Sequence, residues 1–215
     1  MSDGPARDCV LCPRLAAYRA DNAKAHPDWF NGPVPPFGTI GARLLVIGLA
    51  PGVTGANRTG RPFTGDWAGD LLYSSLKTYG FAEGEYDKRP DDGFQLVDAR
   101  VTNAVRCVPP QNKPVGAEIN ACRSFLTEEI TAMADLKVIL CLGRISHDST
   151  LRALGRKPSQ HAFSHGSEHE MEAAHRPVTL LSSYHCSRYN TNTGRLTEEM
   201  FHTVVARARA LADAA

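Results

Sequence analysis

A glycine-rich segment at residues 48–66 carries the side chains of this chain that are best placed to do chemistry. It includes an aromatic ring, Phe63, and it ends on a carboxylate, Asp66. An apolar run at 44–47 precedes it, and apolar residues with helical spacing begin at Trp67. A glycine-rich loop between a buried strand and a helix presents backbone N–H groups to a ligand, and open α/β sheets build their active sites at such loops. The segment therefore predicts a binding cleft.

Cysteine spacing points to a second chemical centre. Of the six cysteines, Cys9 and Cys12 form a C-x-x-C pair, while Cys107 and Cys122 lie far along the chain. The polar start of the sequence does not resemble an export signal, so we expect free thiols rather than a disulfide framework. Four thiolates can hold zinc or an iron–sulfur cluster, and the ligand type alone does not decide between them. The spacing fits equally well with Cys107 and Cys122 as small core residues, which is how we interpret Cys141.

Strand-like and helix-like patterns alternate along the chain and must position these groups. We expect strands at 44–47, 94–105, 137–142 and 178–182, and helices at 67–79, 117–133, 144–154 and from 197 to the C-terminus. This order predicts a three-layer α/β/α sandwich on a short, mainly parallel, four-stranded sheet. The polar segment 156–175 contains four histidines whose spacing fits no zinc pattern, so it predicts a solvated insertion.

The predicted topology brings several loops together, because the loops that follow parallel strands open on the same edge of the sheet. A carboxylate, a carboxamide, an aromatic ring and a histidine are thus expected in one cleft. The loop after the first strand lacks both the G-x-x-x-x-G-K-[ST] and the G-x-G-x-x-G pattern, so kinase-like and dinucleotide-binding functions lose their main support. The four converging loops are 48–66, 103–114, 143–144 and 184–191.

Length, composition and charge limit the number of domains and the classes of partner that we expect. A chain of 215 residues with 42% hydrophobic residues can bury one full core, so we expect one domain over residues 1–215. The formal net charge of +1 neither demands nor excludes a nucleic-acid partner, because phosphate binding depends on local clusters of Arg and Lys. No apolar run is long enough to cross a bilayer, so we expect a cytoplasmic protein with no membrane partner.

Two long motifs resemble those of the uracil-DNA glycosylase superfamily, specifically its family five, the B-type enzymes of bacteria and archaea. The first motif is Gly48-Leu49-Ala50-Pro51-Gly52 with residues 55–66, and the second is Ser183-Tyr184-His185-Cys186-Ser187 with residues 190–197. The resemblance spans nearly the whole chain and includes residues 102–110 between the motifs. Other families of this superfamily carry acidic residues at the positions of Leu49 and Ala50, and this apolar pair favours family five.

The resemblance implies a monofunctional enzyme of base excision repair that hydrolyses the N-glycosidic bond of uracil in double- or single-stranded DNA. The nucleotide is flipped into the cleft, and an abasic site remains. The implied base range extends to other deaminated bases such as hypoxanthine and xanthine. The resemblance further implies a monomer that works at the nucleoid.

The resemblance also implies roles for residues of the cleft. His185 would donate a hydrogen bond to a uracil oxygen, Asn103 would read the uracil edge, and Phe63 would stack on the ring. Asp66 matches the motif aspartate that positions water or stabilises the cationic sugar. Its alternative role is that of a helix cap, and its place near a helix N-terminus predicts a low pKa. Backbone groups would approach the base at Gly48, Ala50 and Gly52.

Contacts to DNA are expected on two segments. The loop 187–195 is expected to enter the minor groove, with Arg188 and Tyr189 as candidates for the wedge that fills the gap left by the flipped base. Three arginines are expected to contact the phosphodiester backbone. The complete set of expected DNA contacts is Arg58, Arg61, Ser187, Arg188, Tyr189, Asn190 and Arg195.

The family's [4Fe–4S] cluster would by position lie on Cys9, Cys12, Cys107 and Cys122 and would have a structural role. Two other functions remain open. A lesion-binding protein without catalysis would bind uracil-containing DNA yet release no base. An iron–sulfur redox protein would not depend on Asn103 or His185.

Overall fold

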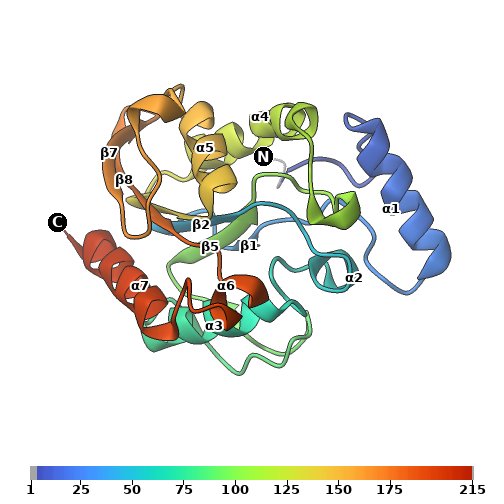
Figure 1. The fold of residues 1–215 in the computed structure, drawn as a ribbon, viewed down its shortest axis with the longest axis horizontal. Coiled ribbons are helices and arrows are strands. Elements are labelled where there is room, and N and C mark those ends of the chain that lie inside the picture. The colour runs from blue at the N-terminus through green and yellow to red at the C-terminus, as the bar shows by residue number, and fades with distance from the viewer. Residues whose placement is uncertain (1–3, 215) are drawn as a thin grey trace.

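The computed structural model describes residues 4–214, in which strands and helices alternate (Figure 1). The main sheet contains β1 (Phe37–Gly38), β2 (Leu44–Gly48), β5 (Ala99–Asn103), β6 (Val138–Leu142), β7 (Glu168–Ala173) and β8 (Arg176–Ser183), and β3 (Ala82–Glu83) pairs with β4 (Gln95–Leu96). The α-helices are α1 (Pro13–Ala25), α2 (Ala56–Thr59), α3 (Trp67–Thr78), α4 (Gly116–Ala132), α5 (Arg144–Ala153), α6 (Arg188–Asn192) and α7 (Glu198–Asp213). Within residues 4–214, none of them has the length and apolar character needed to cross a membrane.

The main sheet has the strand order β1-β5-β2-β6-β8-β7. Its four central strands are parallel, as predicted, while β1 and β7 pair antiparallel at the two edges. The sheet therefore has six strands rather than the expected four. β1 has only two residues and leaves no periodic signal. β7 comes from the segment expected to be a solvated insertion, and its mostly polar sequence hides a strand in which only Met171 and Ala173 are buried.

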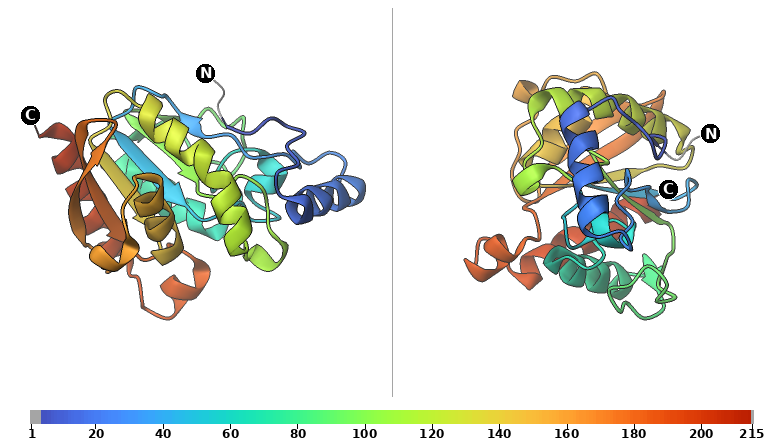
Figure 2. Two further views of the ribbon diagram at one scale, coloured as in Figure 1. Left: turned by 90° about the horizontal axis from the view of Figure 1, so that it is seen from above. Right: turned by 90° about the vertical axis from the view of Figure 1, so that its right-hand side faces the viewer.

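Helices cover both faces of the sheet, which confirms the three-layer sandwich (Figures 1 and 2). Leu44 and Val46 of β2 pack in one apolar cluster with α3 and α7, whereas Leu45 and Ile47 pack in another with α4 and α5. Successive side chains of a strand point to opposite faces, so a strand covered on both sides must be apolar throughout. The uninterrupted apolar run at 44–47 is thus explained by its central place.

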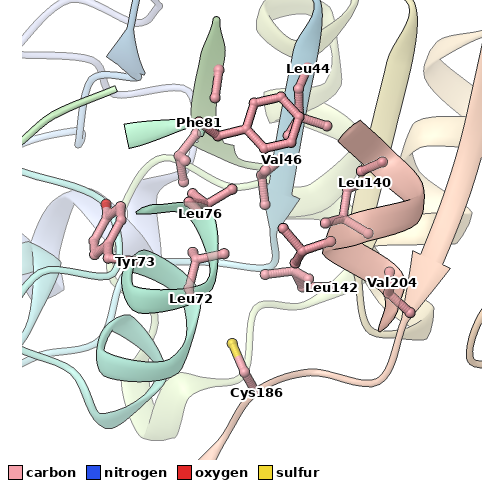
Figure 3. Close-up of a cluster of buried hydrophobic side chains, with 14 of the residues drawn as sticks. Leu44, Val46, Leu72, Tyr73, Leu76, Phe81, Leu140, Leu142, Cys186 and Val204 are labelled. Carbon is pink, nitrogen blue, oxygen red and sulfur yellow. The ribbon is translucent and has the colours of Figure 1, made fainter. Parts of the chain in front are cut away.

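One of these clusters anchors the helix that follows the glycine-rich loop. Figure 3 shows Leu72 and Leu76 of α3 directed toward Leu142 of β6, with Cys186 from the loop after β8 close by. Every one of these side chains is buried. The packing holds the start of α3 against the sheet and so sets the position of Asp66, which immediately precedes the helix.

Helix α1, which the sequence patterns did not predict, lies at one end of the sheet, opposite the β7–β8 hairpin (Figures 1 and 2). It is mostly polar, and one of its few buried side chains is Arg19. The Arg19 guanidinium donates to the carbonyl oxygens of Arg7 and Cys9 at 2.9 and 2.6 Å. The helix therefore ties down the N-terminal loop that carries Cys9 and Cys12.

Candidate active site

A cavity of about 410 Å³ opens where the predicted loops converge. The loop after β2 supplies one wall, the end of β5 another, and the loop after β8 a third. The loop that opens α5 borders a neighbouring cavity that shares His185. The convergence predicted from a parallel sheet is therefore confirmed. The lining residues are Leu49, Ala50, Pro51, Gly52, Phe63, Asp66, Trp67, Ala68, Asn103, Asn112, His185, Ser187 and Arg188.

Asp66 is the only carboxylate among the described residues that line this cavity. It holds the N-cap position of α3, yet its side chain makes no capping hydrogen bond. The carboxylate lies instead against Gly52 and Gly55, where an added Cβ atom would collide with it. Burial raises the pKa of Asp66, while backbone N–H groups of Ala56 and Gly52 and the charge of Arg58 oppose that rise. The predicted low pKa and the capping role are therefore wrong.

Gly48 lies directly against Asn103 and Phe63, two residues that line the cavity. Gly48 and Asn103 are the last residues of β2 and β5 and face each other in the parallel register. A Cβ atom at Gly48 would overlap Asn103 Oδ1 and the Phe63 ring. Phe63 has a φ of 58°, a left-handed conformation that costs a non-glycine residue energy and is often found at functional sites. The glycine thus makes room for two side chains that the sequence places far apart.

His185 follows β8 and faces Phe63, with the two ring centroids 6.0 Å apart and an angle of 26° between the planes. Packing around the imidazole removes water from it and lowers the pKa of His185 to about 4. The ring is therefore neutral at pH 7 and can donate one N–H while it remains uncharged. The Asn190 side-chain amide donates to the His185 carbonyl oxygen at 2.8 Å and holds this turn in place.

Arg61 does not take the predicted place on the DNA surface. Its side chain is buried, and both terminal nitrogens donate to the Asp92 carboxylate at 2.8 Å. Its Nε donates to Thr64 Oγ1 at 2.7 Å. The Arg61 guanidinium and nearby backbone N–H groups keep the pKa of Asp92 well below its usual value, although burial opposes them. Arg61 therefore supports the turn that carries Phe63 and is not available to a phosphate.

The loop 187–195 forms the rim of the cavity. Ser187 caps α6 and accepts a hydrogen bond from the Asn190 backbone, and Arg188 lies over the Trp67 ring at 5.4 Å. The Trp67 indole N–H donates to Thr191 Oγ1 at 3.2 Å, which docks α6 on the start of α3. Tyr189 is 72% exposed, as a side chain available for an outside partner would be.

Cys186 directly follows His185 in the second motif, and it is fully buried. Its thiol donates to the Ala68 carbonyl oxygen at 3.4 Å. The base of the loop is therefore anchored to α3 by packing and a hydrogen bond.

The four cysteines predicted as ligands line one small cavity at the N-terminal end of α1. All four thiols are free. Burial raises the pKa of Cys12, and it raises the pKa of Cys107 to about 12. The charges of the neighbouring thiols add to both rises. Among residues 4–214, no group of three or more Cys, His, Asp or Glu is arranged around a single metal ion. The structure thus brings the four thiols to one place without the geometry of a mononuclear site.

The predicted site lacked five residues that line the cavity, and Trp67 and Asn112 are the two with large or polar side chains. Trp67 lines the cavity and is 52% exposed although it is large and apolar. Its position directly after Asp66 is the sequence feature that could have predicted its place in the site. Asn112 lies in a turn with a φ of 56°, and no local pattern marks it. Of the other expected contacts, Ser187 and Arg188 line the cavity, while Asn190 and Arg195 line its neighbour.

The family described as the uracil DNA glycosylase superfamily matches residues 35–209 of this chain. The fold, the cavity at the carboxyl edge of its parallel strands and this match together place the protein: the chain belongs to the uracil-DNA glycosylase superfamily. Within the superfamily it is similar to the type-5 uracil-DNA glycosylase of Thermus thermophilus, with 42% identity over 210 residues that cover 95% of this chain and 94% of the relative.

Two further relatives place the chain within the superfamily. The type-5 uracil-DNA glycosylase of Pyrobaculum aerophilum is 39% identical, covering 94% of this chain and 88% of the relative. The type-4 uracil-DNA glycosylase of the same organism is only 29% identical, covering 83% and 78%. This difference agrees with the resemblance to family five that Leu49 and Ala50 indicate.

Proposed function

We propose that this protein hydrolyses the N-glycosidic bond of deoxyuridine in DNA, with the nucleotide flipped into the 410 Å³ cavity, and leaves an abasic site. One observation carries the proposal. Phe63, Asp66, Asn103 and His185 come from three separate segments and line the same cavity. An aromatic ring, a carboxamide and a neutral imidazole suit recognition of a planar base, and a carboxylate suits a developing positive charge.

Three of these groups would hold the base. Phe63 offers a ring face for stacking, and Asn103 can pair with a ring N–H and a carbonyl oxygen together. His185 would donate a hydrogen bond to a carbonyl oxygen of the base as negative charge develops there, and its low pKa supports a neutral donor. Backbone groups at Gly48, Ala50 and Gly52 would approach the base, and Ala50 and Gly52 line the cavity.

Asp66 would act on the sugar side. Cleavage of a glycosidic bond passes through an oxocarbenium-like state, which a nearby anion stabilises. The carboxylate lies in the cavity wall, where low exposure strengthens its effect on a charge beside it. Its raised pKa also suits it to orient the attacking water. Because Leu49 and Ala50 cannot ionise, no other described residue of the cavity wall can take this role.

The test is single-turnover release of uracil from a duplex with one deoxyuridine. We expect Asp66→Asn to slow release by about 100-fold or more, the usual loss when one stabilising group is removed. Asp70→Asn is the matched control, because Asp70 lies on the same helix and is paired with Lys88 at the surface. Wild-type rates for Asp66→Asn would refute the role, and a wild-type protein that binds this DNA without releasing base would favour the lesion-binding alternative.

The same assay defines the base range. Leu49, Ala50 and Pro51 form a part of the cavity wall that has no charged or polar side chain, so we infer that the cavity also accepts hypoxanthine and xanthine. We expect measurable release of both bases, with the same dependence on Asp66.

We further propose that Cys9, Cys12, Cys107 and Cys122 hold a [4Fe–4S] cluster. Four cysteine thiolates are the usual ligand set of such a cluster, and here they line one cavity although they come from distant parts of the chain. Ala50 and Val105 pack against these cysteines, so the cluster would support the floor of the base pocket. Its chemistry would be structural, as a cross-link between the N-terminal loop and the 107–122 region. We take the enzyme to be a single-domain monomer that acts on DNA at the nucleoid.

A further inference from the structure

One of the four histidines in the segment 156–175 contacts the second motif, although the spacing of these histidines predicts no site. The Nδ1 atom of His165 lies 3.3 Å from the Tyr184 backbone nitrogen and accepts a hydrogen bond from its N–H group. The two rings are stacked, with centroids 5.2 Å apart and an angle of 29° between the planes. Because Tyr184 immediately precedes His185, this contact acts on the backbone that carries the imidazole of the active site.

The end of the β7–β8 hairpin explains why a side chain accepts this hydrogen bond. The Gly166 N–H donates to the Ser182 carbonyl oxygen at 2.8 Å, and the Ser182 N–H donates to the Ser167 carbonyl oxygen at 3.0 Å. The chain then turns at His165 and Gly166, and Gly166 has a φ of 75°, which favours glycine. Among the described residues, no backbone carbonyl accepts from the Tyr184 N–H, so the His165 ring takes the place of the next strand residue.

The His165 ring is in the protonation state that this contact needs. Burial lowers the pKa of His165, and a backbone hydrogen bond with Met200 opposes that fall only in part. The ring is therefore neutral at pH 7. Because it accepts a hydrogen bond at Nδ1, its proton is on Nε2.

Side chains hold the backbone both before and after His185. The Asn190 amide donates to the His185 carbonyl oxygen at 2.8 Å, and the His165 ring accepts from the residue in front. We propose that His165 is a positioning residue, which holds the backbone before His185 so that the His185 ring faces Phe63 across the base pocket. The proposal rests on the proposed function, because His185 is the group that would act on the base. His165 itself is not among the described residues that line this pocket or its neighbour, so it acts through Tyr184.

The first test is single-turnover release of uracil at saturating DNA. We expect His165→Leu to slow release by about 10- to 100-fold, because a shift of the order of 1 Å in a group that acts on the substrate costs about 100-fold. His165→Asn should stay within about threefold of wild type, because its amide oxygen can accept from the Tyr184 N–H in place of Nδ1. Kd for a duplex with a stable abasic-site analogue should change by less than about threefold in both variants. Only the rate, and not the affinity, should depend on the acceptor.

His169→Leu is the matched control. His169 lies on the same hairpin, and its Nε2–H group donates to the Ala162 carbonyl oxygen at 3.1 Å, within the hairpin loop and not in the second motif. We expect this variant to release uracil at the wild-type rate. If it is as slow as His165→Leu, the loss reflects the hairpin as a whole, and the positioning role of His165 is refuted.

Amide hydrogen exchange measured by NMR on the free protein tests the contact without any activity. The Tyr184 amide should exchange about 10-fold faster in His165→Leu, because its donor loses its acceptor, and at the wild-type rate in His165→Asn. Unchanged exchange in His165→Leu, or base release by His165→Asn as slow as that of His165→Leu, overturns the proposal even though the enzyme is active. If the wild-type protein releases no base while the Tyr184 amide responds as expected, the proposed function fails, and His165 still holds the backbone before His185.

Discussion

At the scale of single residues, the glycines of the first motif make room for other side chains. An added Cβ atom would collide with Asn103 and Phe63 at Gly48, and with Asp66 at Gly52 and Gly55. The sequence pattern suggested backbone contacts to a ligand, but the structure shows that these glycines also admit the functional groups themselves. Glycine is needed where another group occupies the space of a side chain.

We predict that Gly55→Ala slows uracil release by about 100-fold, because a displacement of the order of 1 Å at a catalytic group costs that much. The added methyl group would push the Asp66 carboxylate out of its position. Gly116→Ala is the matched control, since nothing lies within 4 Å of its added Cβ atom and it opens helix α4. Single-turnover kinetics measure the effect, and equal rates for the two variants would contradict it.

The low pKa of His185 predicts a pH dependence of stability. A histidine with a pKa of about 4 in the folded state and about 6.5 in the unfolded state binds fewer protons when folded. Its neutral state therefore favours folding above pH 6.5, and this contribution is lost as the pH falls toward 4. The effect is at most about 1.4 kcal/mol per pH unit.

Urea unfolding of the wild type and of His185→Gln at pH 7 and pH 5 tests this prediction. We expect the wild type to lose more stability than the variant. His147 and His165 also have lowered pKa values, but they are present in both proteins and cancel in the comparison. An equal loss in the two proteins would show that His185 titrates normally.

At the scale of elements, the buried pair Arg61–Asp92 fixes the turn that presents Phe63. The two side chains are 6% and 0% exposed. Asp92 also accepts hydrogen bonds from the backbone N–H groups of Asp87 and Phe94 at 3.0 Å each. The pair thus joins the glycine-rich loop to the segment before β4. A left-handed Phe63 persists because its surroundings hold it there.

We predict that Asp92→Asn lowers the free energy of unfolding by about 3 to 5 kcal/mol, because it leaves the Arg61 charge buried without a partner. The control is Glu85→Gln, which breaks the exposed Lys77–Glu85 pair and should cost less than about 1 kcal/mol. Equilibrium denaturation in urea gives both values. A cost at Asp92 no greater than that at Glu85 would mean that the pair does not hold the turn.

At the scale of the whole molecule, the four cysteines bring the N-terminal segment next to the region that follows β5. Leu15 of α1 and Val105 after β5 pack in the same small cluster as Cys107 and Cys122. Beside them the Arg106 backbone N–H donates to Cys122 Sγ at 3.4 Å. A cluster at this place would join the N-terminal loop to the strand edge that carries Asn103.

We predict that Cys107→Ser abolishes the visible absorption of the iron–sulfur cluster and lowers the unfolding free energy by a few kcal/mol. A cross-link that closes a loop of about 100 residues is worth about 4 to 5 kcal/mol in chain entropy. Cys141→Ala is the control, because Cys141 is a core residue on β6 outside the cysteine cavity. Iron content, absorption and urea unfolding are the measurements, and an unchanged iron content in Cys107→Ser would exclude this residue as a ligand.

The strong periodic signals of the sequence predicted the four parallel strands and the helices α3, α4, α5 and α7, because long buried runs and amphipathic helices constrain residue type at every position. The short or polar elements β1, β7 and α1 lack that constraint. They are held by pairing and packing with distant segments, which no local pattern records.

The candidate site divides in the same way. The alternation of strands and helices along the sequence was enough to predict that the loops carrying Asp66, Asn103 and His185 meet at one sheet edge, because parallel strands all end there. Only the tertiary structure decided that Arg61 is buried on Asp92, that the pKa of Asp66 is raised, and that Arg144 lies beside His185. Charge, exposure and pKa depend on which groups come together from distant parts of the chain, and that is settled only when the chain packs.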